Sequence, residues 1–283
     1  MTDRLFNRVS TVTLARRIRG NVTSSSPGDV IEFRGHTKFD VVTDDGSEAN
    51  QALIQMYNLN NDTQAFLERE NLLCILAVGY AQPQASGPKT IFIGTINKEN
   101  GIHVKRKGPD IMTTLELSDA GAEIRSAVTS ISLKGRVSLD QVLTLLLSGL
   151  QLSIGHRDRL PDFQFANGYS NSGRISKILN DLARKAGFSW SVQRGEIIIL
   201  RGRNTETQRG ILVTKNTGLI GSPMKNKEKV EFRTLIIPDL RPGKRVRLVS
   251  ERYGTINLKA SKVTFVGDNW EGDWMQEVEG VPL

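Results

Sequence analysis

A helical period of apolar residues is the clearest pattern in the chain, and it lies within residues 163–200. The spacing i, i+3, i+4, i+7, i+8 and i+11 defines one face of an amphipathic helix. This face consists of Ile175, Ile178, Leu179, Leu182, Ala183 and Ala186. Asn171 or Ser172 is expected to cap the start, because either side-chain oxygen can accept a backbone N–H. Gly187 is expected to end the helix in a left-handed conformation.

Alternation replaces the helical period beyond this helix. Phe188, Trp190 and Val192 are separated by serines, which predicts a half-buried strand. A turn at 193–195 and a return strand at 196–200 follow. Together with a strand before the helix, the unit reads β-α-β-β and is too small to bury a core alone. We therefore expect it to be an insert between larger parts of the fold.

A second, shorter helix is predicted over residues 139–150. Ser138 and Gln141 have the spacing of a capping box at its start. One apolar face consists of Leu139, Val142, Leu143, Leu146 and Leu147. Leu145 and Leu150 lie outside that face, so we expect part of this apolar surface to contact a partner. The order strand, capped helix, glycine and strand occurs here and again around Gly187, which is a weak internal repeat.

Strand patterns dominate the N-terminal part of the chain. They predict strands over residues 9–14, 30–42 with a turn at Gly35, 51–56, 72–80, 90–96 and 104–117. A single short helix is expected to begin at Asn60 or Asn61. Because a sandwich or a closed barrel hides the edges of such strands, either architecture is favoured for this part.

The C-terminal part returns to the same strand patterns after a polar linker at 201–209. Strands are predicted over residues 230–237, 245–250, 254–260, 262–268 and 273–281. The chain is thus predicted to be a β-rich α+β protein. Two β-barrel or sandwich domains, 1–118 and 206–283, flank an α/β insert at 119–205.

Composition narrows this picture only slightly. The 283 residues suffice for two or three domains, and 38 Lys and Arg against 30 Asp and Glu leave a mild net charge of +8. Cys74 is the single cysteine and is expected to be a buried apolar residue, which excludes a disulfide framework. No signal peptide and no membrane span is evident, so a soluble protein made in a reducing cytoplasm is expected.

Few residues suggest chemistry. His36, His103 and His156 are far apart in the sequence, and no nucleophile elbow or phosphate-binding loop occurs. Two acidic clusters have oxygen ligands that a cation could use, and both are interpreted as solvated turns. They are Asp44, Asp45 and Glu48, and Asp268, Glu271 and Asp273 in a hairpin turn with Trp270 and Trp274. We therefore predict no catalytic, cofactor-binding or metal-binding residues and no enzymatic activity.

Charge is distributed unevenly along the chain. Basic residues gather in two stretches: Lys105, Arg106 and Lys107, and Lys225, Lys227, Lys229, Arg241, Lys244, Arg245 and Arg247. A β-barrel nucleic-acid-binding module is the alternative reading, but stacking aromatics do not interleave with these residues. The last segment is acidic, with Asp268, Glu271, Asp273, Glu277 and Glu279. A C-terminal domain that is basic early and acidic late suits a head-to-tail contact between copies.

Several segments resemble one known family in order and spacing. They are NTGLIGSP (216–223), LIIPDLRPGKRVRLVS (235–250) and KVTFVGDNWEGDWMQEVEG (262–280), with NQALIQMYNLN (50–60), AVGY (77–80) and IFIGTI (91–96) before them. Together they resemble the baseplate hub proteins of contractile-tailed bacteriophages. Phe265 and Val266 stand where the family commonly has a histidine before the Gly-Asp pair.

The resemblance implies a structural role without a catalytic group or cofactor. It implies two tail-tube-like β-barrel domains with an α/β insert, in a homotrimer that belongs to the virion tail baseplate and is assembled in the host cytoplasm. The implied partners are a spike protein, a tail tube or tube-initiator protein, baseplate wedge proteins and a tape-measure protein. In this scheme the hub joins the sixfold tube to the threefold spike, and DNA passes through its channel without specific binding. No membrane partner is implied.

Overall fold

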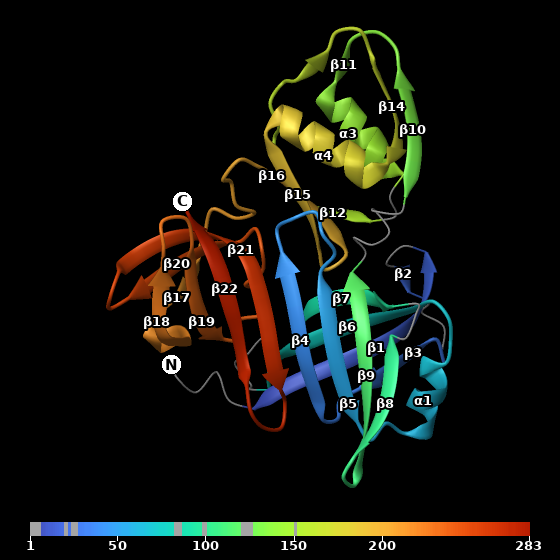
Figure 1. Cartoon of the computed structure of the whole chain (residues 1–283), viewed down its shortest axis with the longest axis vertical. Coiled ribbons are helices and arrows are strands. Elements are labelled where there is room, and N and C mark those ends of the chain that lie inside the picture. Colours follow the sequence, from blue (N-terminus) through green and yellow to red (C-terminus); the bar gives the residue numbers. More distant parts are fainter. Residues whose placement is uncertain are drawn as a thin grey trace.

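The computed structural model describes residues 7–19, 22–23, 28–81, 87–97, 101–119, 127–149 and 152–283. Fifteen of the described strands form one large β-sheet, and a smaller α/β unit lies at one end of it (Figure 1). No helix among them is both long and apolar enough to cross a membrane.

The N-terminal part supplies ten of the elements. They are β1 (Arg8–Arg19), β2 (Val22–Thr23), β3 (Val30–Phe33), β4 (Thr37–Asp44), β5 (Gln51–Tyr57), α1 (Asn61–Leu67), β6 (Leu72–Tyr80), β7 (Lys89–Ile96), β8 (Ile102–Lys107) and β9 (Asp110–Asp119). The predicted helix start is confirmed, because the Asn60 side chain accepts a hydrogen bond from the backbone N–H of Thr63.

The middle part forms the α/β unit. Its elements are β10 (Val128–Leu133), β11 (Val137–Ser138), α3 (Leu139–Ser148), β12 (Ser153–Arg157), β13 (Gln164–Phe165), β14 (Tyr169–Arg174), α4 (Ile175–Ala186), β15 (Phe188–Gln193) and β16 (Glu196–Arg201).

The C-terminal part is again almost entirely strand. Its elements are β17 (Ile211–Val213), η2 (Lys215–Thr217), β18 (Leu219–Lys225), β19 (Val230–Leu235), β20 (Arg245–Ser250), β21 (Gly254–Asp268) and β22 (Trp274–Pro282). The two strands predicted over 254–260 and 262–268 are one long strand, β21, with an irregularity in its pairing between Ala260 and Lys262.

The N-terminal and C-terminal strands belong to one sheet, which corrects the expectation of barrels. The strand order is β18-β19-β22-β21-β4-β5-β9-β7-β6-β1-β2, with β8 on β9, β3 on β1, β20 on β21 and β17 on β20. This order is an open path in the described residues, so neither part closes into a barrel there. The physical reason is that β4 pairs with β21 of the C-terminal part rather than with β3. The boundaries at 118/119 and 205/206 stay predictions.

Two series of four strands repeat the same order within this sheet. The first series is β4-β5-β9-β8 and the second is β18-β19-β22-β21, and every neighbouring pair in both is antiparallel. The pairing of β21 with β4 joins the second series to the first, from Lys262 opposite Asp44 to Asp268 opposite Lys38. The chain therefore carries two related halves, set edge to edge.

One hydrophobic core lies beneath both halves. Burial alternates along β4 and β5, so each strand has one face in the core and one face directed outward. A single cluster of buried side chains takes Phe39 and Leu115 from the N-terminal half and Phe232, Val263 and Trp274 from the C-terminal half. Because this core is shared, neither half can unfold without exposing apolar surface of the other.

Polar contacts reinforce the seam between β4 and β21. Asp268 at the end of β21 pairs with His36 at 3.0 Å and Lys38 at 3.4 Å. His36 is itself stacked between Tyr57 and Trp270, with ring centroids 4.1 and 4.6 Å away. The loop after β21 is thereby held against the start of β4.

The α/β unit has its own core. The predicted apolar faces of α3 and α4 are confirmed, except that Ala183 at the edge of the α4 face is only partly buried. The capping box of Ser138 and Gln141 is confirmed, as is the left-handed conformation of Gly187 (φ 69°). The predicted caps Asn171 and Ser172 are wrong.

Arg174 is the residue that precedes α4, and its side chain makes no capping hydrogen bond. Asn171 and Ser172 are part of β14, where they pair with β10. At the positions where the sequence predicts a helix start, the backbone therefore pairs with β10 in an antiparallel ladder.

Replacing Gly267 tests how tightly the seam is packed. Gly267 lies opposite Phe39, and an added Cβ would be 2.2 Å from the Phe39 ring. Gly267→Ala is therefore expected to lower the free energy of unfolding by about 1–3 kcal/mol, because the ring must leave its position. Urea unfolding measures this loss. Thr264→Val, on the outward face of the same strand, should stay within about 0.5 kcal/mol of wild type.

The double variant Gly267→Ala/Phe39→Leu gives the control for this explanation. If the ring is the obstacle, Gly267→Ala should cost much less in the Phe39→Leu background than in the wild-type background. An equal cost in both backgrounds would show that another contact opposes the added methyl group.

A second prediction concerns pH and the same seam. Burial raises the pKa of Asp268, but hydrogen bonds from the backbone N–H groups of Trp270 and Glu271 and the charge of His36 outweigh it, so the pKa lies below its ordinary value. A carboxyl group with a lowered folded-state pKa stabilises the fold above its unfolded pKa. That stabilisation is lost as the pH falls through the folded pKa.

Asp268→Asn is therefore expected to cost about 1–3 kcal/mol at neutral pH. The difference from wild type should shrink when the pH falls below the lowered pKa of Asp268. Chemical unfolding of both proteins across that range measures it, and a pH-independent difference would contradict the assignment.

Candidate functional site

The three histidines do not form a reactive group. Each pairs with one carboxylate in a different part of the fold: His36 with Asp268, His103 with Glu116, and His156 with Asp158. Among the residues described by the structure, no three His, Cys, Asp or Glu side chains are grouped so that they could hold a metal ion.

The two acidic clusters lie in turns, as the sequence indicates. In the first, Asp44 accepts the backbone N–H of Gly46 at 2.8 Å, and Asp45 pairs with Lys259 at 3.1 Å. In the second, Asp268 accepts the backbone N–H groups of the turn that follows it. Asp44, Asp45 and Asp268 thus interact with donors of the chain itself.

Cys74 lies in the middle of β6 with no exposed surface. Burial raises the pKa of its thiol to about 12. A thiol in that state is not a nucleophile near neutral pH, so Cys74 packs as the apolar residue that the sequence predicts.

The tip of the β15–β16 hairpin docks the α/β unit onto the large sheet. Asn50 donates to the carbonyl oxygen of Val192 at 2.7 Å, and Gln193 donates to the carbonyl oxygen of Asp44 at 2.6 Å. Arg194, at the turn, donates to the carbonyl oxygen of Pro238. One hairpin therefore contacts both halves of the sheet across their seam.

Buried charges strengthen this docking contact. The side chain of Glu206 is 3% exposed and pairs with Arg241 at 2.8 Å and Lys244 at 2.9 Å. Burial, together with the nearby positive charge of Arg241, lowers the pKa of Arg194 to about 10. The sequence placed Glu206 in a solvated linker, and its local pattern holds no sign of this buried role.

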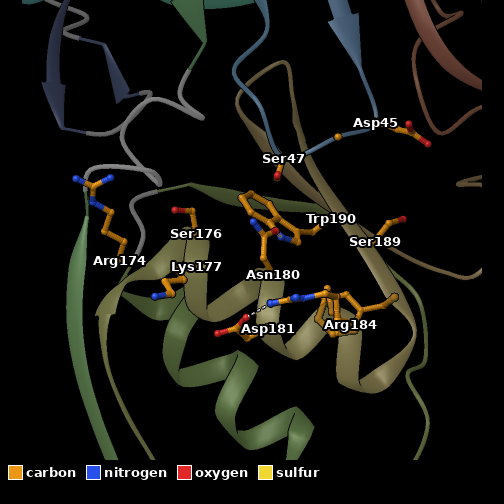
Figure 2. A pocket seen from close by; sticks show the side chains of 13 residues that line it. Asp45, Ser47, Arg174, Ser176, Lys177, Asn180, Asp181, Arg184, Ser189 and Trp190 are labelled. Atoms are coloured by element: carbon orange, nitrogen blue, oxygen red, sulfur yellow. Dashed lines mark hydrogen bonds and ion pairs between the residues drawn. The ribbon is translucent and has the colours of Figure 1, made fainter.

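A groove of about 690 Å³ lies beside the same contact (Figure 2). The turn of Asp45 and Ser47 forms one wall, and α4 with β15 forms the other. Figure 2 shows Lys177, Asn180 and Asp181 along the helix side of the groove. The groove is lined by positively and negatively charged side chains. The indole N–H of Trp190 donates a hydrogen bond to Asn180, and Asp181 forms an ion pair with Arg184. No nucleophile and base are paired among these lining residues.

The outward face of the sheet carries charges that neutralise one another. Glu277 on β22 pairs with Arg233 on β19 at 2.9 Å. Glu279 pairs with Lys229 at 2.8 Å and Lys262 at 3.7 Å, and the hydrogen bond from Lys229 lowers the pKa of Glu279. The basic and acidic stretches of the C-terminal half thus meet within one chain, because β19 and β22 are neighbours. The separation of the basic and acidic stretches in the sequence therefore does not produce separate positive and negative surfaces on this sheet face.

Exposed apolar side chains mark further surfaces. Leu145 is 45% exposed as predicted for a partner contact, whereas Leu146 and Leu147 are buried and Leu150 lies outside the described residues. Others are found at the two ends of the repeated strand series: Ile102, Val104 and Ile111 on the β8–β9 hairpin, and Ile220 and Met224 on β18. The basic residues Lys105, Arg106 and Lys107 are exposed on β8 as well.

Solved structures with this fold come from phage tails and a related secretion system. The tail protein from Neisseria meningitidis MC58 is 9% identical, with a TM-score of 0.62 over 98% of this chain and 97% of that one. The 43 kDa tail protein of prophage MuSo2 from Shewanella oneidensis is 10% identical, with a TM-score of 0.63 over 96% and 97%.

A third structure extends the fold beyond tails. The E. coli c3393 protein, described as a type VI secretion component similar to the T4 tail proteins gp27 and gp5, is 11% identical. Its TM-score is 0.60 over 88% of this chain and 74% of that one. At these identities the three structures establish the fold alone. No curated protein sequence matches the chain.

The family of this chain is identified from its sequence. A model of the family described as baseplate hub gp41 matches residues 46–259, which include most of the large sheet and the whole α/β unit. The resemblance noted in the sequence is confirmed, and it names a family of structural tail proteins. This chain belongs to the baseplate hub gp41 family.

Proposed function

We propose that this protein is the hub that joins the sixfold tail tube to the threefold central spike and forms part of the DNA conduit. The observation that carries this proposal is the repeated strand series within one sheet. One chain presents two similar four-stranded units, so three chains present six. Such a ring meets a sixfold partner on one side and a threefold partner on the other without breaking symmetry at either contact.

The absence of reaction chemistry in the described residues is in keeping with a structural role. Histidines, acidic turns and the cysteine are all occupied by internal packing or pairing. The remaining distinctive features are exposed edges and apolar side chains, which suit contacts with other proteins. The proposed partners are the spike, the tail tube or its initiator, the baseplate wedges and the tape-measure protein. We expect assembly in the host cytoplasm.

The outward sheet face is the best candidate for the lining of the conduit. It runs across both halves through the β4–β21 seam, and its side chains on β19, β21 and β22 are paired charges. DNA passing such a face meets little unpaired positive charge, so it is not retained by phosphate contacts.

The oligomeric state of the purified protein is the first test. We expect light scattering to give the mass of three chains at both low and high salt. Salt screens interactions between exposed charges, but it does not weaken strand pairing and apolar contacts in this way. A monomer that binds DNA in a salt-dependent manner would contradict the hub and favour a nucleic-acid-binding module.

Charge reversal tests the conduit. In phage particles that carry Glu277→Lys/Glu279→Lys, the new lysines would face Arg233, Lys229 and Lys262 and leave several cations unpaired. We expect DNA ejection to slow severalfold, measured as dye-labelled DNA released after triggering. Glu251→Lys, at an exposed position on the turn after β20, is the matched control. Unchanged ejection by assembled mutant particles would place this face outside the channel.

A further inference from the structure

We propose that the groove between α4 and the turn of Asp45 and Ser47 binds an extended acidic segment of a partner protein. The bound segment would lie against the α/β unit on one side and against the N-terminal half of the sheet on the other (Figure 2). This site does not depend on the proposed hub function, because its shape and its charge belong to a single chain.

Hydrogen bonds beside the groove hold its two walls in place. Asn50 donates to the carbonyl oxygen of Val192, and Gln193 donates to the carbonyl oxygen of Asp44. The turn that forms one wall begins at the next residue, so it is held against the strand and helix of the other wall. The volume of about 690 Å³ is within the usual range for ligand sites. Walls that are already in place lose little freedom on binding.

Charge favours an acidic occupant. Five charged side chains line the groove, and the two carboxylates among them, on Asp45 and Asp181, are already paired with cations of the chain. Arg174 and Lys177 are exposed, and neither has a carboxylate partner among the described residues. Figure 2 shows both on the left of the groove, at the start of α4. The lining therefore holds two unpaired positive charges, which the carboxylates of an acidic segment would neutralise.

The uncharged polar groups of the lining also suit an occupant that is rich in acceptors. The side-chain oxygen of Asn180 accepts the indole N–H of Trp190 at 2.9 Å, which leaves its amide N–H groups as donors. The hydroxyl of Ser176, on the first turn of α4, donates to no described residue. Carboxylates and backbone carbonyl oxygens of an extended segment are acceptors for both groups.

The aromatic residues of the groove favour a protein segment over nucleic acid. Phe188 and Trp190 are 7% and 4% exposed, so neither ring offers a face on which a base could stack. Two unpaired cations are also few for a surface that follows a phosphate backbone, because such surfaces neutralise many phosphates. An acidic peptide needs neither feature.

A fluorescein-labelled hexaglutamate peptide is the probe, and hexaglutamine with the same label is the neutral comparison. In fluorescence anisotropy at physiological salt, we expect the wild-type protein to bind hexaglutamate at least about tenfold more tightly than hexaglutamine, because only the acidic peptide gains charge-assisted contacts.

Charge reversal locates the binding in the groove. Arg174→Glu/Lys177→Glu should abolish the preference for hexaglutamate, whereas Arg174→Lys/Lys177→Arg should retain it. Lys134→Glu/Arg136→Glu is the matched control and should bind as the wild type does. It changes the net charge by the same amount on the same α/β unit, at exposed positions outside the groove. Thermal unfolding of each variant shows whether the fold is intact.

Ser176→Trp tests the space in the groove without changing its charge. The new ring would occupy part of the groove, so affinity for hexaglutamate should fall severalfold. Ser148→Trp, at an exposed serine on α3, is the control and should leave the affinity unchanged.

Three results would overturn the assignment. Equal losses in Arg174→Glu/Lys177→Glu and in its control would show a general attraction to a basic chain. Equal affinity of the wild type for hexaglutamate and hexaglutamine would show that the groove does not select acidic segments. Tighter binding of single-stranded hexathymidylate than of hexaglutamate, lost in the same double variant, would assign the groove to nucleic acid. Each of these results would leave the proposed hub function intact.

Discussion

The antiparallel pairing of β4 with β21 is the constraint on which the rest of the structure depends. It joins residues more than two hundred positions apart and merges the cores of the two halves into one. Gly267 makes this approach possible, because its missing side chain leaves room for the Phe39 ring. Asp268 and His36 then hold the adjoining loop against the start of β4. Without this seam, each half would have an exposed edge and an uncovered apolar flank.

The seam also explains how the α/β unit is positioned. The β15–β16 hairpin contacts Asn50 and Asp44 on one side and Pro238 and Arg241 on the other. These contact points exist together only because β4 and β21 have brought the two halves side by side. The buried Glu206 adds a charged contact whose loss would leave Lys244 without this carboxylate and Arg241 with only the more distant Glu196, at 4.0 Å. The α/β unit therefore contacts the sheet at the β4–β21 seam, where residues of both halves are within reach.

A structural role follows from what the fold leaves exposed. In the described residues each of the three histidines pairs with a carboxylate, and the distinctive surfaces are strand edges, apolar side chains and a sheet face with paired charges. The two related halves of the chain place the same strand order twice within one sheet.

Local sequence patterns were sufficient to predict the helices and strands, and the motifs were sufficient to identify the family. Periodicity identified α3 and α4 with their apolar faces, the capping box at Ser138 and the left-handed Gly187, because these depend on neighbours a few residues away. Tertiary structure decided the rest. Asn171 and Ser172 pair with β10 instead of capping the helix. The pairing of β4 with β21 joins strands that were expected in two separate barrel or sandwich domains into one continuous sheet. The positions of Glu206 and of the charge pairs on β22 were likewise decided there, because strand partners distant in sequence leave no local pattern.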